Sequence, residues 1–239
     1  PLLGLCLTLL LSTVTSSTYA NTVGFETDEG SWISLDVAPN GEYLVFELLG
    51  DIYELPIDGG IARPIISGLG FASQPRLSPD GTTLVFVSDR SGEDNLWLAN
   101  ADGSDVRQLS MRTDGELISP AWSSDGQTVY VSQLPSRRSM TGNVALWSYP
   151  VDGSEPIKIS TPNMGRGSML VSTFPPGAYG PQPSARSHEL FFTAAAPRQY
   201  PQITGPRAEI MKVNLQSGRT DLVSSHSAPA FKPQLSRDS

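Results

Sequence analysis

The chain has few histidines that could act in catalysis or bind a metal. His188 and His226 are its only histidines, and no His-x-His or His-Glu-x-x-His pattern supplies a pair of metal ligands. The segment that begins His188-Glu189 starts like the second pattern, but Phe192 stands where the second histidine is needed. We therefore expect both histidines to be structural or surface residues.

Three other kinds of segment resemble catalytic or metal-binding sites but lack the pattern that such sites need. Gly165-Arg166-Gly167-Ser168 lacks the spacing of a Gly-x-Ser-x-Gly nucleophile elbow. The acidic loop Asp89–Asn95 lacks the ligand spacing of a calcium loop. Asp80, Asp125 and Asp152 stand in turn sequences, where aspartate bonds to the local backbone. We expect no catalytic, cofactor-binding or metal-binding residue in this stretch.

The composition indicates which elements carry these residues. The 239 residues include 22 Gly and 20 Pro but only 17% charged residues, which disfavours a helical bundle or a coiled coil. An aromatic content of 8% disfavours disorder. The sequence therefore predicts an all-β fold of short strands and frequent turns. A net charge of −8 argues against nucleic acid as a partner, because phosphates need clustered Lys and Arg.

The N-terminal residues have the pattern of an export signal. Leu2–Leu11 is an apolar block, and the small-residue segment after it ends at Thr18-Tyr19-Ala20. We expect residues 1–20 to be a signal peptide that lacks its true start and residues 21–30 to be a short linker. Cys6, the only cysteine, would be removed with the signal. The chain is then periplasmic or secreted and bacterial, with no membrane contact beyond the signal.

The chain repeats a turn-and-strand unit. A Pro, a polar residue and a Gly precede a strand-like segment three times, in Leu35–Gly41, Pro75–Gly81 and Pro120–Gly126. The second half of each unit repeats as an apolar segment followed by an Asp-Gly turn, at Asp58-Gly59, Asp102-Gly103 and Asp152-Gly153. The period is about 40 to 45 residues, as in the blades of a β-propeller. Each unit predicts four antiparallel strands, which make one blade.

A fourth unit is degenerate, and a fifth only begins. Pro183–Ser187 replaces the Pro-Asp-Gly turn, and the apolar segments Glu189–Thr193 and Glu209–Val213 follow it. Thr161–Pro183 is interpreted as a long Gly- and Pro-rich loop, and the fifth unit would start within residues 229–239. About four blades leave an open series, since closed rings usually have about 4–8 blades and each blade needs neighbours. We therefore expect residues 31–239 to be a propeller that is incomplete at its C-terminus, and the chain to be a piece of a longer protein.

The repeats resemble the TolB-like β-propeller repeat, which has a Ser-Pro-Asp-Gly turn, a strand ending near Ser-Asp-Arg, then Leu-Trp and Asp-Gly. Ser78–Gly103 and Ser123–Gly153 carry this resemblance. Leu48–Gly60 and Gln74–Gly81 are similar to the N-terminal propeller of secreted amidohydrolases. That similarity implies a non-catalytic propeller that positions or gates the catalytic domain of a metal-dependent C–N bond hydrolase.

The resemblance also implies the cofactor and the partners. A divalent metal such as zinc would be bound by a His-x-His pair in a catalytic domain beyond Ser239, which would be the propeller's main partner. A protein or peptide could also contact the propeller rim. Two alternatives stay open: the propeller gate of a prolyl-oligopeptidase-type serine peptidase, and a periplasmic TolB-like protein-interaction propeller. A Gly-x-Ser-x-Gly elbow beyond Ser239 would favour the former.

Overall fold

The computed structural model describes residues 27, 29–30, 33–113, 115–135, 143–159, 177–185, 188–196, 207–224 and 233–235. All the strands lie in one unit of the chain, Trp32–Ser239. The predicted signal peptide at residues 1–20, His226 and the Gly165–Ser168 segment lie outside the described residues, as does the predicted fifth unit apart from residues 233–235. Within the described ranges, no helix is long and apolar enough to cross a bilayer.

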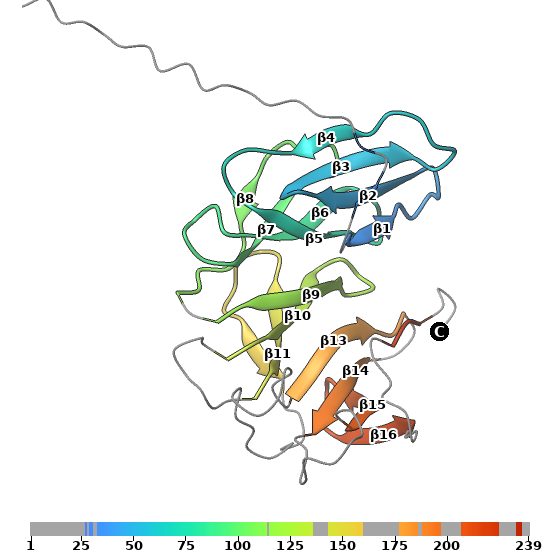
Figure 1. Ribbon diagram of the computed structural model, residues 1–239. Helices are drawn as coiled ribbons and strands as arrows, with labels where there is room; N and C mark the ends of the chain where they lie inside the picture. The colour runs from blue at the N-terminus through green and yellow to red at the C-terminus, as the bar shows by residue number, and fades with distance from the viewer. Residues whose placement is uncertain are drawn as a thin grey trace, which may run out of the picture. The chain divides into compact units, whose positions relative to one another are not determined.

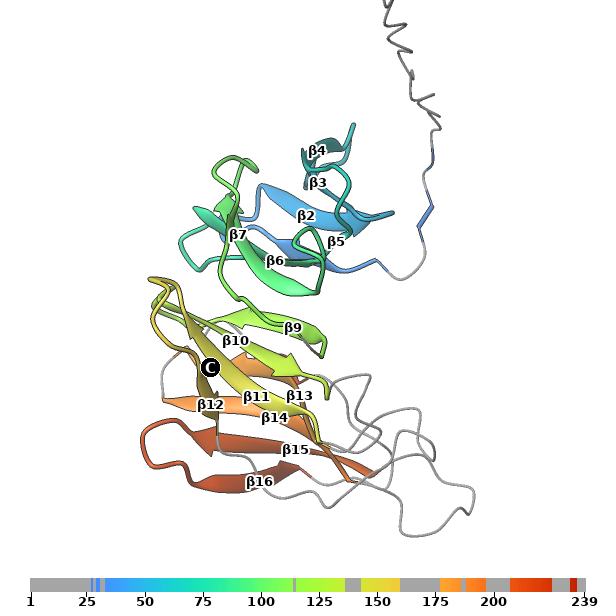
Figure 2. The ribbon, with the colours of Figure 1, turned by 90° about the vertical axis from the view of Figure 1, so that its left-hand side faces the viewer.

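The described strands form four antiparallel sheets of four strands each, as the repeats predict, and follow one another in chain order (Figures 1 and 2). Each sheet is one blade, and its strands are neighbours in simple sequence order. Blade 1 contains β1 (Leu35–Val37), β2 (Tyr43–Leu48), β3 (Asp51–Pro56) and β4 (Arg63–Ile66). Blade 2 contains β5 (Ala72–Leu77), β6 (Thr83–Ser88), β7 (Asn95–Asn100) and β8 (Arg107–Gln108). Blade 3 contains β9 (Leu117–Trp122), β10 (Thr128–Gln133), β11 (Ala145–Pro150) and β12 (Ile157–Ile159). Blade 4 contains β13 (Gly177–Pro183), β14 (Glu189–Ala196), β15 (Arg207–Asn214) and β16 (Thr220–Ser224).

The Pro-Asp-Gly segments form the turns between the first and second strands of blades, as predicted. In blade 2 the N–H of Gly81 donates to the carbonyl of Ser78 at 2.8 Å, and Gly81 has a φ of 73°. Asp80 accepts from the Ser78 hydroxyl at 2.5 Å and from the Thr82 N–H at 3.0 Å. These hydrogen bonds hold the pKa of the Asp80 carboxyl below its usual range. The carboxylate therefore stabilises the turn.

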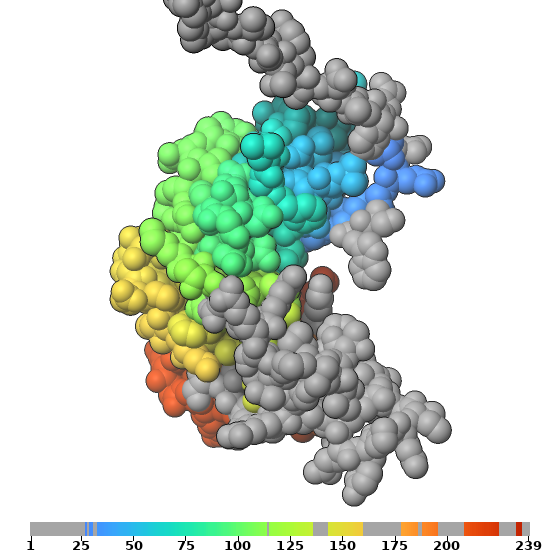
Figure 3. Space-filling model, turned by 60° about the vertical axis from the view of Figure 1, so that its left-hand side comes forward, coloured from blue at the N-terminus to red at the C-terminus, as the bar shows by residue number. Residues whose placement is uncertain are grey.

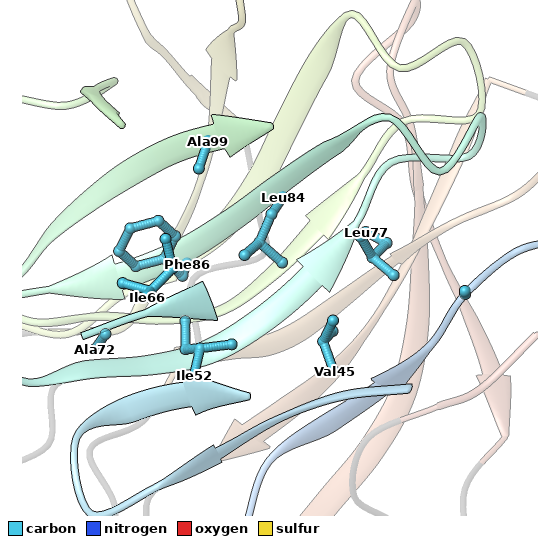
Figure 4. Packing of buried hydrophobic residues seen from close by; sticks show 9 residues of the cluster. Val45, Ile52, Ile66, Ala72, Leu77, Leu84, Phe86 and Ala99 are labelled. Atoms are coloured by element: carbon cyan, nitrogen blue, oxygen red, sulfur yellow. The ribbon is translucent and has the colours of Figure 1, made fainter. Parts of the chain in front are cut away.

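The hydrophobic core lies between successive blades. The first cluster joins Val45 and Ile52 of blade 1 to Leu84 and Phe86 of blade 2, and all four side chains are fully buried (Figure 4). Two further clusters join blade 2 to blade 3 and blade 3 to blade 4. Among the described residues, no such cluster joins blade 4 to blade 1. Each blade is therefore stabilised by its sequence neighbours, and the space-filling view shows successive segments in contact (Figure 3).

One prediction about the fourth unit is wrong. The composition of Thr161–Pro183 predicts a loop, but the last part of this segment, Gly177–Pro183, is strand β13 and pairs with β14. Gly180 and Pro181 lie in this strand at a shift of its register. Gly and Pro are typical of loops, and in a strand they mark bulges, so composition concealed the strand. The two apolar segments Glu189–Thr193 and Glu209–Val213 lie in β14 and β15, as predicted, and a turn at Gly218, whose φ is 70°, joins β15 to β16.

Candidate functional site

The first strands of blades 2, 3 and 4 share a bulge. In each strand a residue with left-handed backbone geometry precedes a proline, at Gln74-Pro75, Ser119-Pro120 and Gly180-Pro181. The φ angles of Gln74, Ser119 and Gly180 are 54°, 57° and 59°. The pairing with the second strand shifts register beside each of them. Two of the three are not glycine, so the surrounding structure must compensate about 1–3 kcal/mol of strain at each.

Side chains provide this compensation by accepting hydrogen bonds from the bulged N–H groups. The N–H of Gln74 donates to Glu47 of blade 1. The N–H of Ser119 donates to Oε1 of Gln74 at 2.6 Å, and the N–H of Gly180 donates to Oγ of Ser132 at 3.1 Å. Every acceptor belongs to the preceding blade. The bulges thus form a chain of polar contacts from blade to blade, and Gln74 is both a donor and an acceptor in it.

Charged side chains gather at the start of this chain, on blades 1 and 2. Arg76 donates through Nη1 to the carbonyl of Pro75 at 2.6 Å and to the Ser34 hydroxyl at 3.2 Å. Asp36 accepts from the N–H of Leu77 at 2.9 Å. Burial lowers the pKa of the Arg76 guanidinium, although the Asp36 and Glu47 carboxylates counteract this effect.

Glu47 contributes a half-buried carboxylate to this group. Burial raises the pKa of its carboxyl, whereas the hydrogen bond from the N–H of Gln74 and the positive charge of Arg76 act to lower this pKa. The group can hold a donor or a cation on blade 1. It can bind and position, but the described part of the chain gives it no histidine with which to activate a nucleophile.

The residues singled out in the sequence lie apart from this group. His188 is exposed and lines a cavity of about 250 Å³ between blades 3 and 4, together with Asp125, Tyr130 and Glu189. The acidic segment Asp89–Asn95 contains the loop between β6 and β7, as predicted. Over the ranges that the structure describes, no three His, Cys, Asp or Glu side chains come together as metal ligands.

Sequence reasoning missed Glu47, Gln74, Arg76 and Ser119. A signal for the bulges at Gln74 and Ser119 was present, because a proline stands six positions before Gly81 and again six positions before Gly126. The acceptor roles of Glu47, Gln74 and Ser132 carried no such signal, since each acceptor lies on another blade than the N–H that donates to it.

Comparison with known proteins places these blades in a family. The sequence profile of the TolB beta propeller domain matches residues 12–157, which is more than half of the chain. Tricorn protease homolog 1 of Streptomyces coelicolor is 30% identical over 122 residues, which are 48% of this chain and 11% of that protein. The chain spans between 11% and 28% of the length of the curated relatives to which it is similar.

Solved structures share the fold. TolB from Acinetobacter baumannii has a TM-score of 0.60 and 15% identity, over 83% of this chain and 45% of TolB. A puromycin hydrolase has a TM-score of 0.59 and 17% identity, over 85% of this chain and 30% of the hydrolase. With the four-stranded blades and their repeated turns, these matches lead to one conclusion: the chain belongs to the TolB beta-propeller family.

Proposed function

We propose that this chain is the propeller part of a larger exported peptidase, in which it controls the access of peptides to a catalytic domain elsewhere in the protein. The observation that carries the proposal is the 30% identity to a tricorn protease homolog over 122 residues. The similarity in fold to a puromycin hydrolase agrees with it. The peptidase alternative is thus favoured over the amidohydrolase that the sequence resemblance implied.

The chain's own groups suit binding and positioning. Glu47, Gln74 and Arg76 offer carboxylate, amide and guanidinium groups on the first strands of the blades or beside them. A peptide backbone needs the same kinds of donors and acceptors, and an N-terminal ammonium would pair with a carboxylate. In this proposal the propeller binds and sorts peptides, and the bond is cleaved by residues outside the chain.

Labelling of the active serine tests the proposal. The protein that contains this chain, purified from its source, should react with a fluorophosphonate probe, because an activated serine attacks phosphorus and expels fluoride. The 239-residue chain alone should stay unlabelled. Labelling should disappear with the peptidase activity when the serine of a Gly-x-Ser-x-Gly elbow is changed to alanine. Hydrolysis that a chelator abolishes, without serine labelling, would reject the peptidase and favour the amidohydrolase.

The metal implied by the amidohydrolase reading does not fit the described residues. No three candidate ligands come together among them, so a divalent ion such as zinc would need ligands from the rest of the protein.

A second candidate function is a periplasmic protein-interaction propeller. It is supported by the similarity in fold to TolB from Acinetobacter baumannii, at a TM-score of 0.60. This candidate would be favoured if the parent protein showed no serine labelling and no chelator-sensitive hydrolysis. Export is proposed for both candidates from the apolar segment Leu2–Leu11, and secretion of a reporter fused to residues 1–30 tests it.

A further inference from the structure

An apolar patch is exposed on one face of blades 1 and 2. It consists of Leu49, Leu69 and Phe71, whose exposed fractions are 72%, 110% and 55%. Leu49 lies in the loop between β2 and β3, and the other two lie in the loop between β4 and β5. A single exposed leucine is ordinary, but a contiguous apolar patch indicates an interaction site. We call these three residues the loop-face patch.

Two glycines allow the loops that carry the patch to pack closely against their neighbours. A Cβ on Gly50 would lie 2.8 Å from the ring of Phe71, so the ring packs against the backbone beside Leu49. A Cβ on Gly70 would lie 2.6 Å from Cβ of Arg90. The N–H of Phe71 donates to Oδ1 of Asp89 at 2.7 Å, which ties the β4–β5 loop to the β6–β7 loop. These contacts fix the positions of the loops that carry the patch.

A hollow lies beside the patch. Its volume is about 550 Å³, and it is lined by Ser67, Leu69, Gly70, Asp89, Arg90 and Gly92. That volume is within the range of ligand sites, about 300–1,000 Å³. The exposed side chain of Leu69 is thus part of both the patch and the hollow.

The charges around the hollow select the partner. The segment Asp89–Asp94 contains three carboxylates and one guanidinium, on a chain whose net charge is −8. The Arg90 guanidinium lies over the rings of Phe86 and Trp97, 5.2 Å from each centroid, so its charge is held against the aromatic faces. The surface is therefore apolar with a surplus of negative charge. It repels anionic partners such as nucleic acid and attracts cationic ones.

We propose that the loop-face patch and its hollow bind an extended peptide segment that combines apolar side chains with Lys or Arg. The apolar side chains contact Leu49, Leu69 and Phe71, and the cationic ones pair with the carboxylates of the β6–β7 loop, including the exposed Glu93. This proposal does not rest on the peptidase assignment, because it concerns binding by this chain alone.

Fluorescence anisotropy with a labelled peptide tests the proposal. The probe has the sequence Ala-Leu-Lys-Phe-Lys-Leu-Ala, and a matched peptide carries Glu in place of both Lys. The full 239-residue chain should bind the Lys peptide and show little binding of the Glu peptide. Added salt should weaken the binding, since exposed charges are screened.

Variants on both faces locate the binding. Leu69→Ser should weaken the binding about tenfold, because it removes an apolar side chain that the bound peptide covers. Glu93→Gln should weaken it about two- to threefold and reduce its salt dependence. Both side chains are exposed, so neither change disturbs the core.

The matched controls are Ile61→Ser and Glu155→Gln. Ile61 is 92% exposed and Glu155 is also exposed, but both lie in loops that join third to fourth strands, on the opposite face of the blades. Neither control should change the affinity. An absence of binding at about 1 mM peptide, where a specific site should be occupied, would overturn the proposal. Equal binding of the Glu peptide, or an equal loss with Ile61→Ser, would overturn it as well.

Discussion

Two glycines in equivalent turns should respond very differently to the same substitution. Gly103 and Gly153 both follow an aspartate in the turn between the third and fourth strands of a blade, with φ angles of 87° and 84°. The preceding aspartates accept from the N–H groups of Ser104 and Ser154, both at 2.9 Å. Local structure therefore makes Gly103→Ala and Gly153→Ala a matched pair.

The neighbouring blade distinguishes them. A Cβ on Gly103 would lie 2.0 Å from the carbonyl oxygen of Ile65 in β4, whereas a Cβ on Gly153 would meet nothing within 4 Å. Both variants must hold alanine in a left-handed conformation, at a cost of about 1–2 kcal/mol. Gly103→Ala must also displace backbone across the interface between blades, and overpacking costs typically about 1–3 kcal/mol more.

Urea unfolding followed by tryptophan fluorescence measures the difference. We expect Gly153→Ala to lose about 1–2 kcal/mol of unfolding free energy and Gly103→Ala about 2–5 kcal/mol. In a thermal scan the gap should appear as at least about 2–4 °C. Equal losses in the two variants would refute the reasoning, because they would show that the β4 backbone exerts no constraint on the blade 2 turn.

Three further predictions use the same unfolding measurement. Gln74→Ala should cost about 1–3 kcal/mol, because it leaves the N–H of Ser119 without its acceptor; a neutral result would reject the polar chain between blades. Asp80→Asn should be less stable than the parent at neutral pH. The pKa of Asp80 is lowered in the folded state, so its contribution is present above the ordinary aspartate pKa and is lost as pH falls through the lowered one; a difference that persists in acid would contradict this cause. Phe86→Ala should cost about 3–5 kcal/mol of unfolding free energy, because Phe86 is fully buried between blades 1 and 2. Phe46→Ala should cost clearly less, because Phe46 is only half-buried, on the side of blade 1 that faces away from blade 2. Equal costs would mean that this other side of blade 1 is also covered.

Much of the fold could be predicted from the sequence, because it depends on local chemistry. A Pro-Asp-Gly segment forms a tight turn wherever it stands, since Gly accepts a positive φ and Asp bonds to the nearby backbone. The segments around Gly41, Gly81 and Gly126 therefore indicated both the turns and the strands on either side. The recurrence of the unit then indicated blades, because a four-stranded unit can bury its faces only against similar neighbours.

The same local reasoning failed where a strand has an unusual sequence. β13 contains two Gly and two Pro within Gly177–Pro183, and it pairs with β14 despite this composition. Its bulge at Gly180 is compensated by the hydroxyl of Ser132 on the neighbouring blade. Strand formation here depends on a partner that the segment itself does not specify.

The candidate site was even less predictable. Glu47 and Gln74 are 27 residues apart in the chain, and only the packing of blade 2 on blade 1 brings the N–H of Gln74 to the carboxylate. The loop-face patch arises in the same way, since Leu49 and Phe71 come from different loops that meet at Gly50.

The sequence by itself determined the repeated unit, its turns and the all-β class, because each depends on residues close together in the chain. Tertiary structure decided which bulges are supported, which of Gly103 and Gly153 has no room for a methyl group, and which apolar side chains stay exposed. Those outcomes depend on the distances between atoms of different blades. Blade packing fixes these distances, and no local pattern in the chain encodes them.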